Sequence, residues 1–186
     1  MTTTIGAALT FEEHGAQLFR SAVFSDLPEL ATALSGLPTD KAGVRLQGVT
    51  ALNSFLLPDG SIGKLAKQLI GPRSKAVRAI LFDKSEHNNW SLAWHQDRTI
   101  CVKRRIDVEG FGPWTSKGGM HHVAPPFDVL SRMVTLRVHL DDVPADNAPL
   151  LIAPGSHREG RVSERAISKV IERTGIATCI ASAGDV

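Results

Sequence analysis

The residues best placed to do chemistry together are His95 and Asp97, two positions apart in the chain. Side chains at alternate positions of an extended segment point the same way, so this imidazole and this carboxylate can reach one metal ion. A His and a carboxylate are two of the three protein ligands in the facial triad that holds non-haem Fe(II) and leaves coordination positions open for O2 and a co-substrate. The sequence therefore predicts a metal centre at His95-Gln96-Asp97 that a histidine from elsewhere in the fold completes.

The stretch Lys103 to Asp128 is rich in glycine and proline, and its composition predicts a long loop. A loop of about 25 residues inside a compact domain usually has a function, which here would be to cover the site as a lid. Trp114 is either a packing anchor for this loop or a wall of the pocket, and Met120 is a second candidate contact for substrate. The adjacent His121 and His122 are interpreted as solvated side chains rather than metal ligands.

Two cations outside this loop could meet anionic groups. Lys84 lies eleven residues before His95, where it either lines the co-substrate pocket or is a solvated strand end. Arg137 belongs to the apolar-alternating run from Val134 to Leu140, a pattern that predicts a strand with Arg137 and His139 on one face. If that face is interior, Arg137 can bind a carboxylate of the substrate; if it is exterior, both are surface residues.

The elements that must position these residues change character along the chain. Helices are predicted first: one that Thr10 caps and that carries Leu18 and Phe19, one from Ser25 or Asp26 to about Gly36, one from Ser61 to Gly71, and a late one from about Ser163 to Arg173. Short strands are predicted at 76–82, 91–94, 99–102, 134–140 and 150–153. This order predicts a mainly β fold with flanking helices.

Composition restricts the class of protein. The chain of 186 residues suits one domain, and a 42% hydrophobic content is enough for a core. The net charge of +2 comes from dispersed residues, which argues against nucleic-acid or membrane partners and favours a small-molecule substrate. Cys101 and Cys179 are far apart without metal-site spacing, and the first residues lack the pattern of a signal peptide. These features predict a cytoplasmic protein and leave its oligomeric state open.

Several motifs in a fixed order resemble those of the phytanoyl-CoA dioxygenase-like family, whose members include ectoine hydroxylases. The motifs are Trp94-His95-Gln96-Asp97, Trp114 with Lys117-Gly118-Gly119-Met120, Arg137-Val138-His139-Leu140-Asp141-Asp142, and Asn147-Ala148-Pro149-Leu150 leading to Pro154-Gly155-Ser156-His157. Ala148 departs from the resemblance, since glycine is common there. The resemblance implies a double-stranded β-helix (a cupin-like jelly roll) forming one oxygenase domain over 1–186, with a mostly helical part at 1–75 and the core at 76–186. It implies Fe(II), 2-oxoglutarate and O2, with hydroxylation of the substrate and release of succinate and CO2.

The resemblance also implies where the remaining ligands lie. The distal histidine of the family follows a Gly-Asp-Val type turn, and an arginine about eleven residues later binds 2-oxoglutarate; here Gly184-Asp185-Val186 is the end of the chain, so both are expected beyond Val186, on a last core strand that the chain lacks. His157 is the alternative third ligand. Two other classes remain open: a non-catalytic jelly roll that binds a small molecule or metal, and a cupin-type hydrolase or isomerase that holds Zn(II) or Mn(II) with His95, Asp97 and His157.

Overall fold

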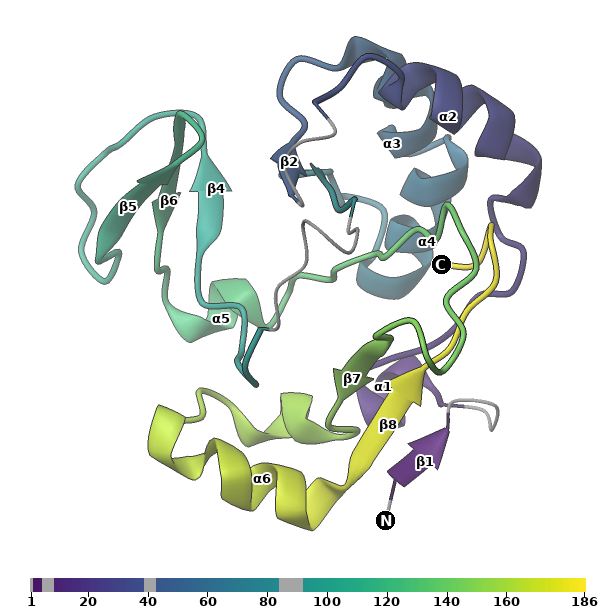
Figure 1. Ribbon diagram of the computed structural model, residues 1–186. Coiled ribbons are helices and arrows are strands. Elements are labelled where there is room, and N and C mark those ends of the chain that lie inside the picture. Colours follow the sequence, from purple (N-terminus) through teal and green to yellow (C-terminus); the bar gives the residue numbers. More distant parts are fainter. Residues whose placement is uncertain (1, 5–8, 39–42, 84–91) are drawn as a thin grey trace. The chain divides into compact units, whose positions relative to one another are not determined.

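The computed structural model describes residues 2–4, 9–38, 43–83 and 92–186, and the chain forms two compact units (Figure 1). The first unit combines the N-terminal segment, Met1–Ala31, with the C-terminal segment, Thr135–Val186. The second unit is the intervening segment, Thr32–Val134. His95 and Asp97 belong to the second unit, whereas Arg137 and His157 belong to the first.

The first unit is built on a three-stranded sheet of order β1-β8-β7. Strand β1 pairs with β8 in parallel and β7 pairs with β8 antiparallel, with Leu151 opposite Thr178. Figure 1 shows helix α6 leading directly into β8. Side chains of Val23, Val162, Val170, Ala177 and Ala181 are buried in this unit. Its elements are β1 (Thr2–Thr4), α1 (Phe11–His14), β7 (Leu150–Ile152), α6 (Ile167–Thr174) and β8 (Ile176–Cys179), with 3-10 turns at Phe24–Asp26, Ser156–Glu159 and Glu164–Ala166.

The second unit holds helices, a short ribbon of two strands and a sheet of three strands. Helix α2 (Leu27–Leu34) carries the chain into it, and Leu52, Phe55, Ile62 and Val123 are buried there. Its other elements are β2 (Val44–Arg45), a 3-10 turn at Thr50–Leu52, α3 (Asn53–Leu56), α4 (Ser61–Ile70), β3 (Ile80–Leu81), β4 (Ile100–Val102), β5 (Trp114–Lys117), β6 (Met120–Val123) and α5 (Phe127–Leu130). Strand β2 pairs with β3, and the order of the larger sheet is β4-β6-β5.

Two predicted helix boundaries need correction. Thr10 caps α1 as predicted, since its hydroxyl accepts from the Glu13 N–H at 3.3 Å, but Gly15 adopts a φ of 69° and ends the helix well before Leu18 and Phe19. Helix α4 was predicted to be capped by Ser61. The N-cap is instead Gly60, and the Ser61 hydroxyl is buried without a hydrogen-bond partner among the described residues. The end of α4 at Gly71 agrees with the prediction.

Part of the stretch predicted as a long lid loop, residues 114–123, is a β-hairpin. Strands β5 and β6 pair antiparallel, with Lys117 opposite Met120, so Gly118 and Gly119 form a two-residue turn. Both glycines have positive φ, 57° and 75°, as the type I′ turn of a hairpin requires. The prediction was wrong because glycine was taken as a sign of loop, although a Gly-Gly pair between two short polar and apolar runs is also a hairpin signal.

Strand predictions were correct for two short apolar runs. Strands β4 and β7 lie within two predicted strands, but 134–140 forms no regular strand, and only Ile80–Leu81 of 76–82 does. In the part of the chain that is described, the three sheets do not close into a barrel, so the fold is mixed helix and strand and the jelly roll stays a prediction. No helix in the described ranges is long and apolar enough to cross a bilayer.

Candidate metal centre

His95 and Asp97 lie on an irregular segment that leads into β4. Exposure alternates along it: Trp94 and Gln96 are half-buried, whereas His95 and Asp97 are exposed. That alternation is the signature of an extended backbone, which places the imidazole and the carboxylate on one side. The structure therefore supports the geometric premise of the predicted pair.

A backbone contact orients the His95 ring. Its Nδ1 lies 2.7 Å from the carbonyl oxygen of Ala93, and a carbonyl can only accept, so Nδ1 carries the proton. The lone pair is then on Nε2, which is the form in which a neutral imidazole binds a metal. A histidine ligand commonly has its other ring nitrogen bonded to a backbone carbonyl in this way. Nε2 of His95 and the carboxylate of Asp97 thus fit two positions of an Fe(II) site.

A third ligand is not gathered around this pair within the described ranges. Among these residues no group of three or more His, Cys, Asp or Glu side chains is arranged to hold a metal ion. Lys84, a predicted contact of the co-substrate, lies outside the described residues.

Trp114 and Met120 do not lie together. Trp114 opens β5 opposite Val123, and Met120 opens β6 opposite Lys117. Because Met120 and Val123 are three positions apart in one strand, their side chains point to opposite faces of the sheet. Trp114 is half-buried under the Arg105 guanidinium, whose carbon is 5.5 Å from the ring centroid, a cation–π contact. One face of this sheet can offer a ligand Trp114 or Met120, but not both.

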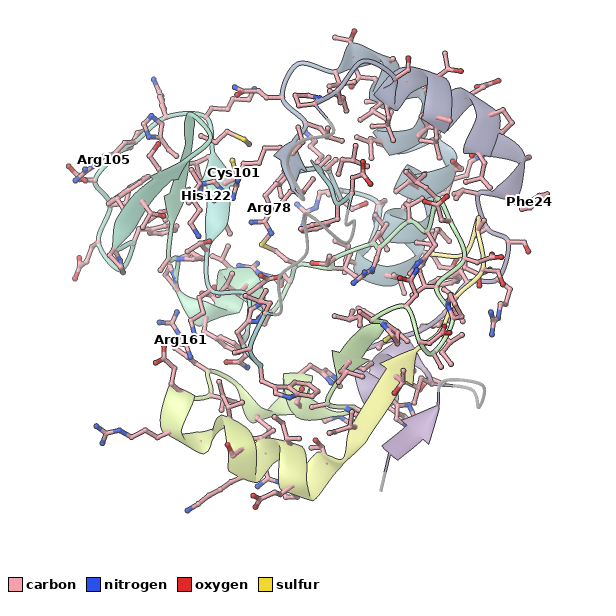
Figure 2. All side chains as sticks on the ribbon, in the orientation of Figure 1. Phe24, Arg78, Cys101, Arg105, His122 and Arg161 are labelled. Carbon is pink, nitrogen blue, oxygen red and sulfur yellow. The ribbon has the colours of Figure 1, made fainter. Side chains whose placement is uncertain are left out.

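The interpretation of His122 as solvated was wrong, whereas His121 is exposed as expected. His122 is 1% exposed, lies opposite Cys101 of β4, and donates from Nδ1 to the Met120 carbonyl at 3.1 Å (Figure 2). Its Nε2 is buried and has no partner among the described residues. His121 of the same strand points to the opposite face and is exposed, so the burial of His122 depends on which face of β6 is covered at this position.

Arg137 and His139 were predicted to share one face of a strand, but their burial differs and 134–140 forms no regular strand. Arg137 is exposed, and His139 is 7% exposed. Burial lowers the pKa of His139, and the nearby positive charge of Arg137 lowers it further, against the effect of Asp185. Burial also raises the pKa of the Cys179 thiol, which Arg137 partly opposes. His139 is thus buried in its unit, and Arg137 is exposed.

His157 packs against the N-terminal helix. A Cβ added at Gly15 would lie 2.6 Å from Cγ of the His157 ring, so only glycine leaves room there. The same segment satisfies carbonyl groups of α1: the Gly155 N–H donates to His14 at 2.8 Å and Arg158 donates to Glu12 at 3.1 Å. Part of the Pro154-Gly155-Ser156-His157 motif therefore stabilises α1 by packing against it and donating a hydrogen bond to it.

We expect His157→Ala to lower the free energy of unfolding by about 1 kcal/mol or less, because the side chain is exposed, although its ring lies against Gly15. Affinity for Fe(II) should not change. Urea denaturation and anaerobic Fe(II) titration check both points, with His121→Ala as the control for an exposed histidine. A tenfold or greater loss of Fe(II) affinity in His157→Ala alone would instead make His157 a ligand.

Comparison with known proteins agrees with these motifs. The family model described as phytanoyl-CoA dioxygenase (PhyH) matches residues 41–186, a span that includes His95, Asp97 and Trp114. No curated protein and no solved structure matches the chain significantly. Members of the matched family are generally dependent on Fe(II) and 2-oxoglutarate. Since the match spans most of the chain, the protein belongs to the phytanoyl-CoA dioxygenase (PhyH) family.

Proposed function

We propose that this protein is an Fe(II)- and 2-oxoglutarate-dependent dioxygenase that hydroxylates a small molecule. The observation that carries the proposal is the His95–Asp97 pair, with Nε2 of His95 left free by the Ala93 contact, in a chain of this family. A single oxygenase domain with a jelly-roll core is part of the proposal. Bound Fe(II), together with 2-oxoglutarate and O2, would supply the oxidising chemistry and release succinate and CO2.

His95 and Asp97 hold the metal in this proposal, each in a different way. The Ala93 carbonyl fixes the His95 ring, so its Nε2 is presented without a rearrangement when the metal binds. Asp97 contributes a negative charge, which favours a divalent cation over a neutral ligand. The third ligand is proposed to be a histidine beyond Val186, where an arginine for 2-oxoglutarate would follow, and His157 is the alternative.

Positioning of the substrate is proposed to fall chiefly to Trp114 of the second unit. Trp114 is half-buried and held by Arg105, so its ring is a rigid apolar surface against which a substrate or 2-oxoglutarate can lie. We propose Lys84 as a further contact of 2-oxoglutarate, and Arg137, which belongs to the first unit, as a contact of the substrate. Because Trp114 and Met120 face opposite sides of the hairpin, Trp114 is the one we place at the site.

The test is whether the complete protein converts 2-oxoglutarate to succinate in a manner that needs both metal and O2. We expect succinate with Fe(II) in air, none under argon, and none after chelation, with recovery on adding Fe(II) but not Zn(II). Absence of succinate from a folded, Fe(II)-loaded protein, with a panel of candidate substrates, would refute the proposal. Recovery of an O2-independent reaction with Zn(II) would favour a hydrolase or isomerase instead.

A further inference from the structure

Arg45 of β2 is a partly buried cation that pairs with no carboxylate in the part of the chain that the structure describes. Its side chain is half-buried, and its Nε is enclosed and makes no hydrogen bond within the described ranges. The carboxylates of the same unit that form ion pairs are used elsewhere: Asp107 pairs with Arg105, and Asp128 pairs with Arg132. An enclosed guanidinium donor without an acceptor destabilises the fold, because it has lost its hydrogen bonds to water. Arg45 therefore has an unused capacity to bind an acceptor.

The hairpin turn between β5 and β6 encloses the Arg45 side chain. A Cβ added at Gly118 would lie 3.3 Å from Cδ of Arg45 and 3.9 Å from its Nη1, so the glycine lets the turn approach closely. The positive φ of Gly118, 57°, is a second reason for glycine there. The turn thus lies against the stem of Arg45 at Cδ and close to Nη1 of its guanidinium.

A second arginine lies on the same face of the β2–β3 ribbon. Arg45 is opposite Ile80, and the pairing continues through the Leu46 N–H to the Ala79 carbonyl at 3.0 Å. Residues directly opposite in an antiparallel pair share a face, and so do residues two apart. Extending the register one residue past Ala79, before β3 begins, assigns Arg78 to the face of Arg45 as its diagonal neighbour. Figure 2 labels Arg78 on the segment that leads into β3. Arg78 is exposed and pairs with no carboxylate among the described residues.

We propose that Arg45 and Arg78 form a binding site for an oxyanion, a carboxylate or phosphate group of a small molecule. Two guanidinium groups on one face match the planar geometry of such groups, which arginine binds with two parallel hydrogen bonds. Arg45, whose Nε is shielded from water, provides the stronger contact, because a charge-assisted hydrogen bond gains strength where solvent is excluded. Arg78 contributes charge from the exposed side. The site needs no metal, so it stands independently of the proposed oxygenase reaction.

The experiment uses metal-free protein with chelator present, so that binding of 2-oxoglutarate through iron does not contribute. Thermal unfolding is followed with inorganic phosphate, acetate or chloride at constant ionic strength. We expect the midpoint to rise and saturate with phosphate or acetate but not with chloride. The stronger of the two oxyanions identifies the kind of group that the natural ligand carries.

Variants assign the effect to the two arginines. Arg45→Gln should abolish the saturating rise, and Arg78→Gln, which changes an exposed side chain and leaves folding intact, should weaken oxyanion affinity several-fold. Arg104→Gln is the matched control, because Arg104 is an exposed arginine of the same unit away from this ribbon, and it should behave as wild type. The proposal is overturned if phosphate and acetate shift the midpoint no more than chloride does. It is also overturned if Arg78→Gln binds the oxyanions as tightly as the Arg104→Gln control and wild type do.

Discussion

Replacing His95 or Asp97 with alanine is expected to lower the rate of succinate formation by more than about 100-fold. Mutation of outer partners of metal ligands already costs about 10 to 100-fold in affinity or activity, and loss of a ligand should cost more. Both side chains are exposed, so the free energy of unfolding should change by no more than about 0.5 kcal/mol. Steady-state assays and thermal unfolding of the same preparations measure the two effects separately.

The matched control is His121→Ala, which removes an exposed histidine from the same unit without touching the pair. It should keep wild-type activity. Activity of His95→Ala or Asp97→Ala within about threefold of the His121→Ala control would show that this pair does not hold the metal, since a three-ligand site does not tolerate loss of one third of its ligands without a large loss of affinity.

Replacing Asp185 with alanine is expected to cost about 2–4 kcal/mol of unfolding free energy. Its carboxylate is 1% exposed and accepts from the Ser21 N–H at 2.7 Å, the Ser182 N–H at 3.0 Å and Arg20 at 2.8 Å. Alanine would leave buried donors without an acceptor. Arg20→Ala should cost under about 1 kcal/mol, because the Arg20 side chain is 58% exposed and water replaces its partner.

The position of Asp185 explains why the effect should be large. The Asp185 carbonyl accepts from the His139 N–H at 3.0 Å, and the neighbouring Val186 exchanges two backbone hydrogen bonds with Phe19. The Gly184-Asp185-Val186 turn thus links Phe19 of the N-terminal segment to His139 through backbone hydrogen bonds. Chemical denaturation measures the cost, with exposed Asp146→Ala as the control, and equal midpoints for the two variants would contradict this account.

The stability of the protein at acidic pH should also depend on Asp185. Burial acts to raise the pKa of Asp185, but the hydrogen bonds from Ser182, Ser21 and Arg20 outweigh it and the pKa lies below its ordinary value. A carboxyl whose folded-state pKa is lowered contributes stability that is fully present above its unfolded-state pKa and is lost as the pH falls through the lower, folded-state pKa. The stability of Asp185→Ala should therefore fall less between pH 5 and pH 2, roughly, than that of wild type.

The local elements with strong signals could be predicted from sequence, and those that depend on tertiary contacts could not. The cap at Thr10, the end of α4 at Gly71 and strands β4 and β7 follow from side-chain chemistry within a few residues. The run 134–140 alternates like a strand, yet His139 bonds to the turn at 184–185 rather than to a neighbouring strand. Periodicity reports which face is buried, and His139 is indeed buried, but it does not report the partner that buries it.

For the candidate site too, some features could be predicted from local sequence and others depend on tertiary contacts. The pairing of His95 with Asp97 needed only the two-residue period of an extended chain, and the alternating exposure agrees with it. The burial of His122 was missed because it depends on which face of β6 the rest of the unit covers, and the local sequence does not specify that face. The packing of His157 on Gly15 joins positions 142 residues apart, which no local pattern specifies.

The most direct test of the central claim is the affinity of the complete protein for Fe(II), measured by anaerobic titration calorimetry in wild type, Asp97→Ala and Asp59→Ala. Asp59 is an exposed carboxylate of the same unit and serves as the matched control. The account predicts one Fe(II) per chain in wild type and in Asp59→Ala, and an affinity at least about tenfold lower in Asp97→Ala. Equal Fe(II) affinity in all three proteins would contradict the claim that His95 and Asp97 form the metal centre.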